Sequence, residues 1–251
     1  MVNPEITLVL PVFNEEANVG PLLTRVDEAM SASQLSYCVL VVDDGSTDST
    51  YEVLQSFESR LPLRISRHAR NEGLGYTIRD GLIEAAQACA PDDISVPMDA
   101  DDTHHPALIS AMLRKIREGF DVVIASRFQP GAECFGVPAH RRLLSSAASS
   151  LFRLVLPTEG VRDFTCGYRA YRAGVLQKAI ATYGDSFLES DGFQCMIDVL
   201  LHLRALKARF TEVPVVLRYD RKQGGSKMRV IRTIRKTLLL IARRRMTDLR
   251  Y

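Results

Sequence analysis

The chain of 251 residues, 46% hydrophobic and 25% charged, has the composition of a soluble globular protein and is long enough for one large domain or two small ones. It contains no run of 18 apolar residues and its start lacks a signal-peptide pattern, so we expect neither a transmembrane helix nor a secretory leader. The net charge is +2, but the charges are distributed unevenly along the chain. Residues 1–220 carry 21 basic and 29 acidic side chains, whereas residues 221–251 carry 11 basic side chains and one acidic side chain.

Apolar and amphipathic segments alternate along the first half of the chain. This alternation predicts βαβ units and a largely parallel sheet flanked by helices, which is an α/β fold. The expected strands are residues 6–12, 37–45, 61–66, 92–99 and 120–128, and the expected helices are residues 14–30, 46–57, 73–90 and 106–119. Two helices carry start signals, since Ser49 and Glu52 have capping-box spacing and Pro106 stands in the first turn of its helix.

Polar residues lie at the ends of four of the expected strands. The carboxyl ends of parallel strands meet at one edge of the sheet, where α/β proteins bind ligands, so we expect these residues to lie together. Each pattern alone is also typical of a turn or a helix cap, and only their recurrence at one edge indicates a site. They are Asn14 and Glu15 at the end of the first strand, Asp43 and Asp44 at the end of the second, Asp99 and Asp101 at the end of the fourth, and Arg127 at the end of the fifth.

The spacing of Asp99 and Asp101 indicates a cation site. If the strand continues through Asp101, both carboxylates share one face and can hold a hard divalent cation, Mg²⁺ or Mn²⁺. His104 and His105 lack a third ligand at zinc-like spacing and are better explained by turn chemistry before the next helix. The five scattered cysteines form no C-x-x-C pair, which fits reduced thiols in the cytoplasm and argues against a zinc site.

Five short motifs together carry a family resemblance. They are LPVFNEEANV, VLVVDDGSTDST, NEGLGYTIRDGL, MDADDTHHP and ASRF. In this order and spacing they resemble the inverting nucleotide-sugar glycosyltransferases with the GT-A fold, and among these the dolichol- or polyprenyl-phosphate mannosyltransferases. The resemblance extends from about Ile6 to Lys227. It implies a Rossmann-like GT-A domain, which we place at residues 1–227, followed by a C-terminal helix at residues 228–251.

The resemblance also implies the donor-binding residues. Asp99, Ala100 and Asp101 match the D-x-D motif that handles the metal and the donor diphosphate, with Asp101 central to catalysis. Where the family motif continues with Leu and Gln, this chain has Asp102 and Thr103, so Thr103 becomes the expected neutral oxygen ligand and Asp102 adds a charge. Pro11, Phe13 and Glu15 would line the nucleotide site. Val42 and Asp44 would contact the base and ribose, and Gly73 and Leu74 would lie beneath the nucleotide.

The second half resembles the acceptor region of the same family. It implies contacts to the acceptor phosphate from Arg127, Arg141, Ser145, Arg221, Ser226 and Lys227, with Arg127 and Arg141 acting in catalysis. Guanidinium groups fork onto phosphate oxygens, which suits that task.

The nature of the acceptor decides the chemistry. A phosphate acceptor is already an anion, whereas a hydroxyl acceptor needs a base. The segment LESDGF favours the phosphate, since Ser190 separates Glu189 from Asp191, but Asp191 stays open as a base. GDP-mannose is the favoured donor and a UDP-glucose type the alternative. A non-catalytic nucleotide-binding subunit is the other alternative, against which the intact metal motif and arginines argue.

The C-terminal segment predicts a basic amphipathic helix. Its apolar stripe consists of Val230, Ile231, Ile234, Leu238 and Ile241. Arginines surround the stripe with almost no acids, which favours peripheral binding to the anionic cytoplasmic face of a membrane. The alternative is that the stripe packs on the core. We expect no nucleic-acid partner, because the segment has no aromatic residue before Tyr251.

Overall fold

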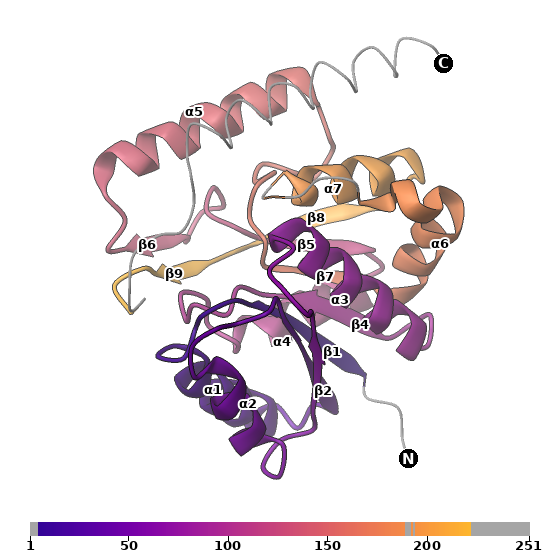
Figure 1. Ribbon diagram of the computed structural model, residues 1–251. Helices are drawn as coiled ribbons and strands as arrows, with labels where there is room; N and C mark the ends of the chain where they lie inside the picture. Colours follow the sequence, from indigo (N-terminus) through magenta and orange to yellow (C-terminus); the bar gives the residue numbers. More distant parts are fainter. Residues whose placement is uncertain (1–4, 189–191, 193, 222–251) are drawn as a thin grey trace.

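The computed structural model describes residues 5–188, 192 and 194–221, in which a seven-stranded sheet lies between helices (Figure 1). The strand order is β3-β2-β1-β4-β7-β5-β8, and a separate pair is formed by β6 and β9. Every strand of the large sheet runs in one direction except β7, which is antiparallel to β4 and β5. The predicted α/β fold with a mostly parallel sheet is therefore confirmed.

The elements follow in chain order. The strands are β1 Ile6–Val12, β2 Tyr37–Asp43, β3 Leu63–Arg67, β4 Ile94–Pro97, β5 Val122–Ser126, β6 Glu133–Phe135, β7 Arg169–Arg172, β8 Phe210–Pro214 and β9 Val216–Arg218. The helices are α1 Val19–Ala32, α2 Thr50–Phe57, α3 Leu74–Ala88, α4 Leu108–Arg117, α5 Ala139–Val155, α6 Ala173–Tyr183 and α7 Cys195–Ala205, with a 3₁₀ turn at Gly184–Phe187.

The central strands are apolar throughout because both of their faces are covered. In β1, Leu8 and Leu10 belong to the main core, whereas Val9 packs on the other face with residues of β2 and α3. Helices α1 and α2 pack together on one side, and α3 and α6 on the other (Figure 1). Helix α3 lies so close to the sheet that a Cβ added at Gly81 would be 2.5 Å from Val9 Cγ1. This packing fixes the start of α3 beside the ends of β1 and β2.

Three local expectations were wrong. Strand β4 ends at Pro97, so Asp99 and Asp101 do not lie on a strand. Its pairing with β7 covers only Ile94 and Ser95, and Pro97 has no N–H with which to extend that ladder. Ser49 is the N-cap of α2 as predicted, but its side chain makes no capping hydrogen bond, and Asp48 instead accepts from the N–H of Thr50. Helix α4 begins two residues after Pro106, which stands in the preceding turn.

The antiparallel strand β7 shapes the edge that the sequence predicts as a site. It separates β4 from β5, and the chain that leads into it, residues 163–168, runs beside the end of β5, where the N–H of Ala125 donates to the backbone oxygen of Tyr168 (3.0 Å). No helix among the described residues is long and apolar enough to cross a membrane. The expected C-terminal helix at residues 228–251 lies outside the described residues.

Candidate functional site

The ends of β1 and β2 are tied to each other. The N–H of Asp44 donates to the backbone oxygen of the last residue of β1 (2.8 Å), and the N–H of Asn14 donates to Oγ of Ser46 (2.9 Å). Asn14 has a left-handed backbone (φ 52°), which turns the chain sharply after β1. This turn leaves Phe13 and Glu15 half-buried at the edge of the sheet, beside the end of β2.

The carboxylate of Asp44 is held by three donors. Its oxygens accept hydrogen bonds from the N–H groups of Glu72 (2.8 Å) and Gly73 (2.9 Å), and Nδ1 of His68 lies 2.8 Å away. Gly73 has φ 103°, a conformation that L side chains rarely adopt, so glycine is required where the chain turns into α3. Asp44 and Gly73, which the resemblance places in one nucleotide site, are therefore in direct contact.

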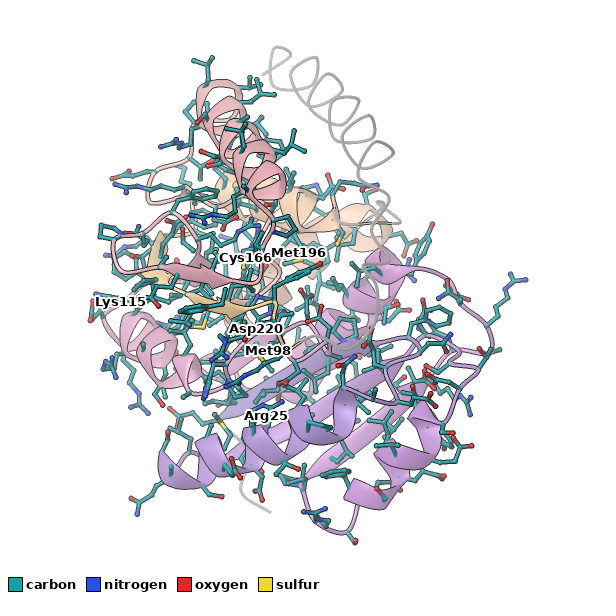
Figure 2. The ribbon with its side chains drawn as sticks, turned by 90° about the vertical axis from the view of Figure 1, so that its left-hand side faces the viewer. Arg25, Met98, Lys115, Cys166, Met196 and Asp220 are labelled. Carbon is teal, nitrogen blue, oxygen red and sulfur yellow. The ribbon has the colours of Figure 1, made fainter. Side chains whose placement is uncertain are left out.

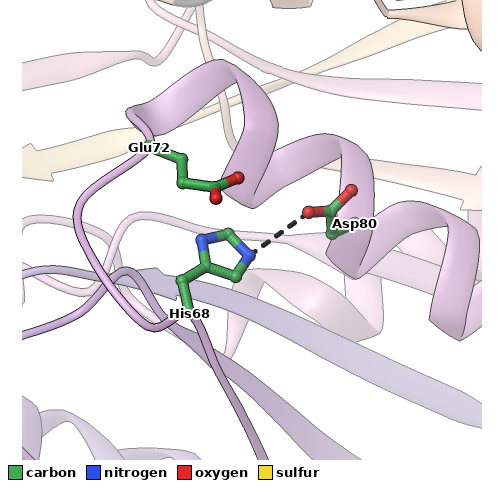
Figure 3. Close-up of side chains that lie close together, drawn as sticks. All are labelled: His68, Glu72 and Asp80. Atoms are coloured by element: carbon green, nitrogen blue, oxygen red, sulfur yellow. Dashed lines mark ion pairs between the residues drawn. The ribbon is translucent and has the colours of Figure 1, made fainter.

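The same His68 forms a cluster with the acidic residues Glu72 and Asp80 (Figure 3). One nitrogen or oxygen atom from each residue lies within 4.8 Å of the others, which suits a metal ion geometrically. However, Nδ1 of His68 faces Asp44, its Nε2 lies 3.2 Å from Asp80, and Asp80 also accepts from Arg79. These contacts explain the cluster as a network that positions the Asp44 carboxylate.

The D-x-D loop follows β4 as an irregular turn. Asp99 and Asp101 are half-buried there, and the Thr103 hydroxyl donates to Oδ1 of Asp101 (2.7 Å). The Thr103 N–H also lies 3.2 Å from that oxygen. Thr103, which was expected as a metal ligand, is thus buried and orients the Asp101 carboxylate.

The adjacent Asp102 has a different partner. It is buried, has a left-handed backbone (φ 61°) and forms an ion pair with Arg25 of α1, whose Nε lies 2.8 Å from Oδ1. The positive charge that offsets the third carboxylate of this acidic loop therefore comes from 77 residues away. Asp102 is turned toward α1 by this pair, and Asp99 and Asp101 are left as the candidate cation ligands.

The chain before β7 closes over the D-x-D loop. A Cβ added at Gly167 would lie 3.4 Å from Oδ1 of Asp99, so glycine permits this approach. The buried Arg169 fixes the segment by donating to the backbone oxygens of Cys166 and Met196, which lie close together in Figure 2. Burial, reinforced by the charge of Asp163, raises the pKa of Cys166 to about 12, so its thiol stays neutral and is a poor metal ligand.

Arg127, at the end of β5, is held by a bidentate ion pair. Its Nε and one Nη donate to the two oxygens of Asp163 (2.8 and 2.7 Å), and that Nη also donates to Thr165 Oγ1 (2.6 Å). Burial acts against both charges, but the pair outweighs it, lowering the pKa of Asp163 and raising the pKa of Arg127. Glu212 in turn accepts from the backbone N–H of Asp163. This network presents Arg127 in one fixed orientation.

The end of β9 is attached to the D-x-D loop. The N–H of Arg218 donates to the backbone oxygen of Thr103 (2.9 Å). Burial, then the charges of Arg221 and Arg25, lower the pKa of His105 in the loop. Arg221, predicted to bind acceptor phosphate, thus lies within electrostatic reach of the D-x-D loop.

Helix α5 carries the predicted contacts Arg141 and Ser145. It lies apart from the sheet and its covering helices in Figure 1, and Ser145 is half-buried. Three residues before its start, a Cβ at Gly136 would meet the backbone N of Asp220 at 2.7 Å, and Asp220 follows the Arg218 that is bonded to Thr103 of the D-x-D loop. The helix also displays large apolar side chains with high exposure, namely Leu143 72%, Leu144 50%, Leu151 41% and Leu154 79%.

The other predicted residues divide into three groups. Pro11 is buried one residue before the end of β1, Ala100 is buried in the D-x-D loop, and Leu74 is half-buried in the first turn of α3. Val42 is fully buried, with its side chain against α3 rather than at the edge of the sheet. Ser226, Lys227 and the alternative base Asp191 lie outside the described residues.

Sequence reasoning missed Asp163, Glu212 and His68. Asp163 lies in the segment RDFTCGYRAYR, and an acid two residues before a threonine in such a loop was the available signal. Glu212 and His68 gave no signal in the sequence, because each acts through a partner far along the chain, Asp163 for Glu212 and Asp44 for His68.

The donor set near Asp99 fits a divalent cation. Two half-buried carboxylates supply the oxygen ligands that Mg²⁺ and Mn²⁺ prefer. Beside them, His104 Nδ1 is buried and has no hydrogen-bond partner in the described part of the chain. A buried polar atom without a partner is costly, and a cation in the loop would remove that cost.

Solved structures with the same fold are enzymes that act on sugars. Glucosyl-3-phosphoglycerate synthase from Mycobacterium tuberculosis, crystallised with Mn²⁺, UDP-glucose and phosphoglyceric acid, superposes with a TM-score of 0.66 at 21% identity, covering 95% of this chain and 79% of that one. Mannosyl-3-phosphoglycerate synthase from Rubrobacter xylanophilus gives a TM-score of 0.66 at 20% identity, covering 99% and 76%. These likenesses establish the GT-A type of fold.

Residues 7–180 match glycosyl transferase family 2, and the chain belongs to this family of glycosyltransferases. The dolichol-phosphate mannosyltransferase of Pyrococcus furiosus is 30% identical over 90% of this chain, which spans 59% of that relative's length. The polyprenol monophosphomannose synthase of Mycolicibacterium smegmatis is 33% identical, covering 88% of this chain and 80% of that protein. The undecaprenyl-phosphate mannosyltransferase of Micrococcus luteus is 32% identical, covering 89% and 87%.

Proposed function

We propose that the protein transfers a hexose, mannose from GDP-mannose being favoured, onto a polyprenyl or dolichyl phosphate, with inversion at the anomeric carbon. The single observation that carries this proposal is the composition of α5. The predicted phosphate contacts Arg141 and Ser145 share this helix with four exposed leucines, and Gly136, three residues before its start, packs on the chain after β9 that is bonded to the D-x-D loop. One helix thus offers both a polar and an apolar surface, as a lipid phosphate requires. The names of the three relatives support the same acceptor class.

The donor is proposed to bind across the ends of β1, β2 and β4. Asp44, fixed by His68 and by the start of α3, would accept hydrogen bonds from the ribose or the base, and Phe13 and Glu15 would line the opposite wall. Asp99 and Asp101 would hold Mg²⁺ or Mn²⁺ with the diphosphate, and the bound cation would neutralise the charge that develops on the leaving group. Thr103 would keep the Asp101 carboxylate in place.

The acceptor phosphate is proposed to be positioned by arginines. Asp163 and Thr165 use three of the five N–H donors of Arg127, which leaves the pair on Nη1 for a phosphate oxygen. Another phosphate oxygen attacks the anomeric carbon from the face opposite the diphosphate, and the carbon–oxygen bond to the diphosphate breaks. Because the phosphate is already an anion at neutral pH, this route requires no base. Arg141, Ser145, Arg221, Ser226 and Lys227 would complete the phosphate site.

The reaction is proposed to take place at the cytoplasmic face of a membrane. All five cysteines are free thiols, which fits a reducing compartment. Helix α5 contains three arginines and no acidic residue, so an anionic bilayer surface would attract the helix that exposes the leucines.

The test is a transfer assay with purified full-length protein. GDP-mannose and UDP-glucose are each offered with a short polyprenyl phosphate, the matching polyprenol, or 3-phosphoglycerate, and the lipid-linked or soluble product is identified by mass spectrometry. We expect mannose transfer to the polyprenyl phosphate and none to the polyprenol. Transfer to the polyprenol would restore the hydroxyl mechanism with Asp191, and product from phosphoglycerate alone would overturn the lipid acceptor.

A further inference from the structure

His104 is the one imidazole in the D-x-D loop that faces a carboxylate of the motif. It is 5% exposed, and its Nδ1 lies 3.9 Å from Oδ2 of Asp99. That separation is too long for a hydrogen bond, and Nδ1 is buried without any such partner in the part of the chain that the structure describes. The ring is fixed against Tyr168, with centroids 5.0 Å apart, and the Tyr168 hydroxyl donates to the backbone oxygen of His105 (3.1 Å).

We infer that Nδ1 of His104 is a third protein ligand of the divalent cation that Asp99 and Asp101 are proposed to bind. Two ligands of one six-coordinate ion, each at about 2.1–2.3 Å, lie about 3 Å apart when adjacent and about 4.4 Å apart when opposite. The 3.9 Å between His104 Nδ1 and Asp99 Oδ2 exceeds the adjacent separation by about 0.8 Å, so the two side chains would move together by that amount to occupy adjacent positions on one ion.

The neighbouring residues explain why a histidine would take this role. Thr103 stands where the resemblance places a metal-contacting Gln, but its shorter side chain is buried and its hydroxyl is turned toward Asp101. Asp102 is paired with Arg25. Its left-handed backbone turns the chain between Asp101 and His104, so that side chains of one short loop converge. His104 therefore replaces a ligand that its neighbours do not supply.

An imidazole ligand alters which cation the site prefers. Mg²⁺ favours oxygen ligands and retains its waters, whereas Mn²⁺ accepts nitrogen more readily. We therefore expect the protein to bind Mn²⁺ more tightly than Mg²⁺ and to owe that preference to His104. This inference rests on the proposed metal-dependent function, and its test must separate the two.

The test uses Mn²⁺ bound to the full-length protein in the presence of pyrophosphate. Pulsed electron paramagnetic resonance detects a directly bound ¹⁴N, and labelling of histidine with ¹⁵N identifies it as imidazole. His104→Gln is compared with His105→Gln, because His105 is its exposed neighbour in the same loop. We expect the histidine coupling in wild type and in His105→Gln, and its loss in His104→Gln. The Mn²⁺ affinity of His104→Gln should fall at least about tenfold, and the Mg²⁺ affinity much less.

Each outcome decides the inference. Mn²⁺ binding without a histidine coupling, or with a coupling that persists in His104→Gln, overturns the ligand role and leaves the proposed transfer reaction intact. Wild-type protein that binds no Mn²⁺ overturns the metal-dependent function together with this inference. Thermal unfolding without metal controls for misfolding, and His104→Gln should unfold no earlier than His105→Gln.

Discussion

Arg127 and Asp163 face each other through two parallel hydrogen bonds, with the Asp163 carboxylate fully buried and the Arg127 side chain one-quarter exposed. The pair joins the end of β5 to the segment that closes over Asp99. Removal of one partner from such a pair leaves a buried charge without compensation, which costs far more than the loss of a surface ion pair. The pair is therefore both a structural link and the support for a proposed acceptor contact.

Asp163→Asn should lower the free energy of unfolding by about 2–4 kcal/mol at pH 7, the range for a broken buried pair allowing for the partial exposure of Arg127. The pKa of Asp163 is lower in the folded state, so its contribution is present above the unfolded pKa of about 4 and is lost as the pH falls through the folded pKa. The difference between variant and wild type should therefore shrink in acid. Urea titrations across this range measure it.

The matched control is Asp92→Asn. Asp92 also pairs with an arginine, Arg172 at 3.1 Å, but its side chain is 93% exposed. We expect little change in stability at any pH. A similar loss of stability in both variants would show that the Arg127–Asp163 pair contributes no more to the free energy of unfolding than an exposed ion pair does.

Arg127→Ala tests the acceptor role separately. If Nη1 binds the lipid phosphate, kcat/KM for the acceptor should fall by about 2–4 kcal/mol in free-energy terms, while donor affinity changes little. Because this variant also leaves the buried Asp163 carboxylate without its ion-pair partner, its activity is compared with that of Arg127→Lys. Lysine keeps the positive charge but cannot form the bidentate hydrogen bonds of arginine. Equal losses in donor and acceptor affinity would assign Arg127 to the donor diphosphate instead.

The neighbouring carboxylates Asp101 and Asp102 should behave in opposite ways. Asp101→Asn should lose at least about 100-fold in transfer rate with its stability unchanged, because it is half-buried and proposed to act on the cation. Asp102→Asn should be destabilised, since it breaks the buried pair with Arg25, while retaining most of its affinity for Mn²⁺. Chelation should stop wild-type turnover reversibly. Full turnover by Asp101→Asn, with and without chelator, would contradict the cation assignment.

The contrast between these two acids shows what the sequence could and could not predict. The ends of parallel strands had to meet at one edge, so Asp44, Asp99 and Arg127 were placed together from the alternation of elements alone. The role of Asp102 depends on Arg25, 77 residues earlier, and a pairing at that distance leaves no local pattern. The early end of β4 depends on how few residues β7 pairs, which no property of β4 itself reveals.

His68→Ala should weaken donor binding through Asp44. The imidazole supports one oxygen of that carboxylate, and the loss of one such contact is worth about 1 kcal/mol, or roughly a fivefold rise in the Kd of the nucleotide. The effect should appear in the KM for the donor rather than in kcat. Calorimetry with the nucleoside diphosphate measures it. Glu72→Ala serves as the control, because its exposed side chain can be removed while its backbone N–H still donates to Asp44. An effect of Glu72→Ala as large as that of His68→Ala would instead point to a metal ion in their cluster.

The exposed stripe of α5 should enter a lipid surface. Leu143 and Leu154 are eleven residues apart, about three whole turns, and Leu151 lies about 80° round the helix from Leu143, so the three share one side of the helix. The chain contains no tryptophan, and a single introduced indole therefore reports its own surroundings. We expect the fluorescence of Leu143→Trp and of Leu154→Trp to shift to the blue on addition of anionic vesicles, less so with neutral vesicles or high salt. Gln55→Trp, on the exposed surface of α2, should not shift. A shift of the α5 probes that needs no lipid but depends on protein concentration would mean that a second copy covers the stripe. A blue emission independent of both would mean that the chain itself covers it, and either result would contradict docking on the membrane.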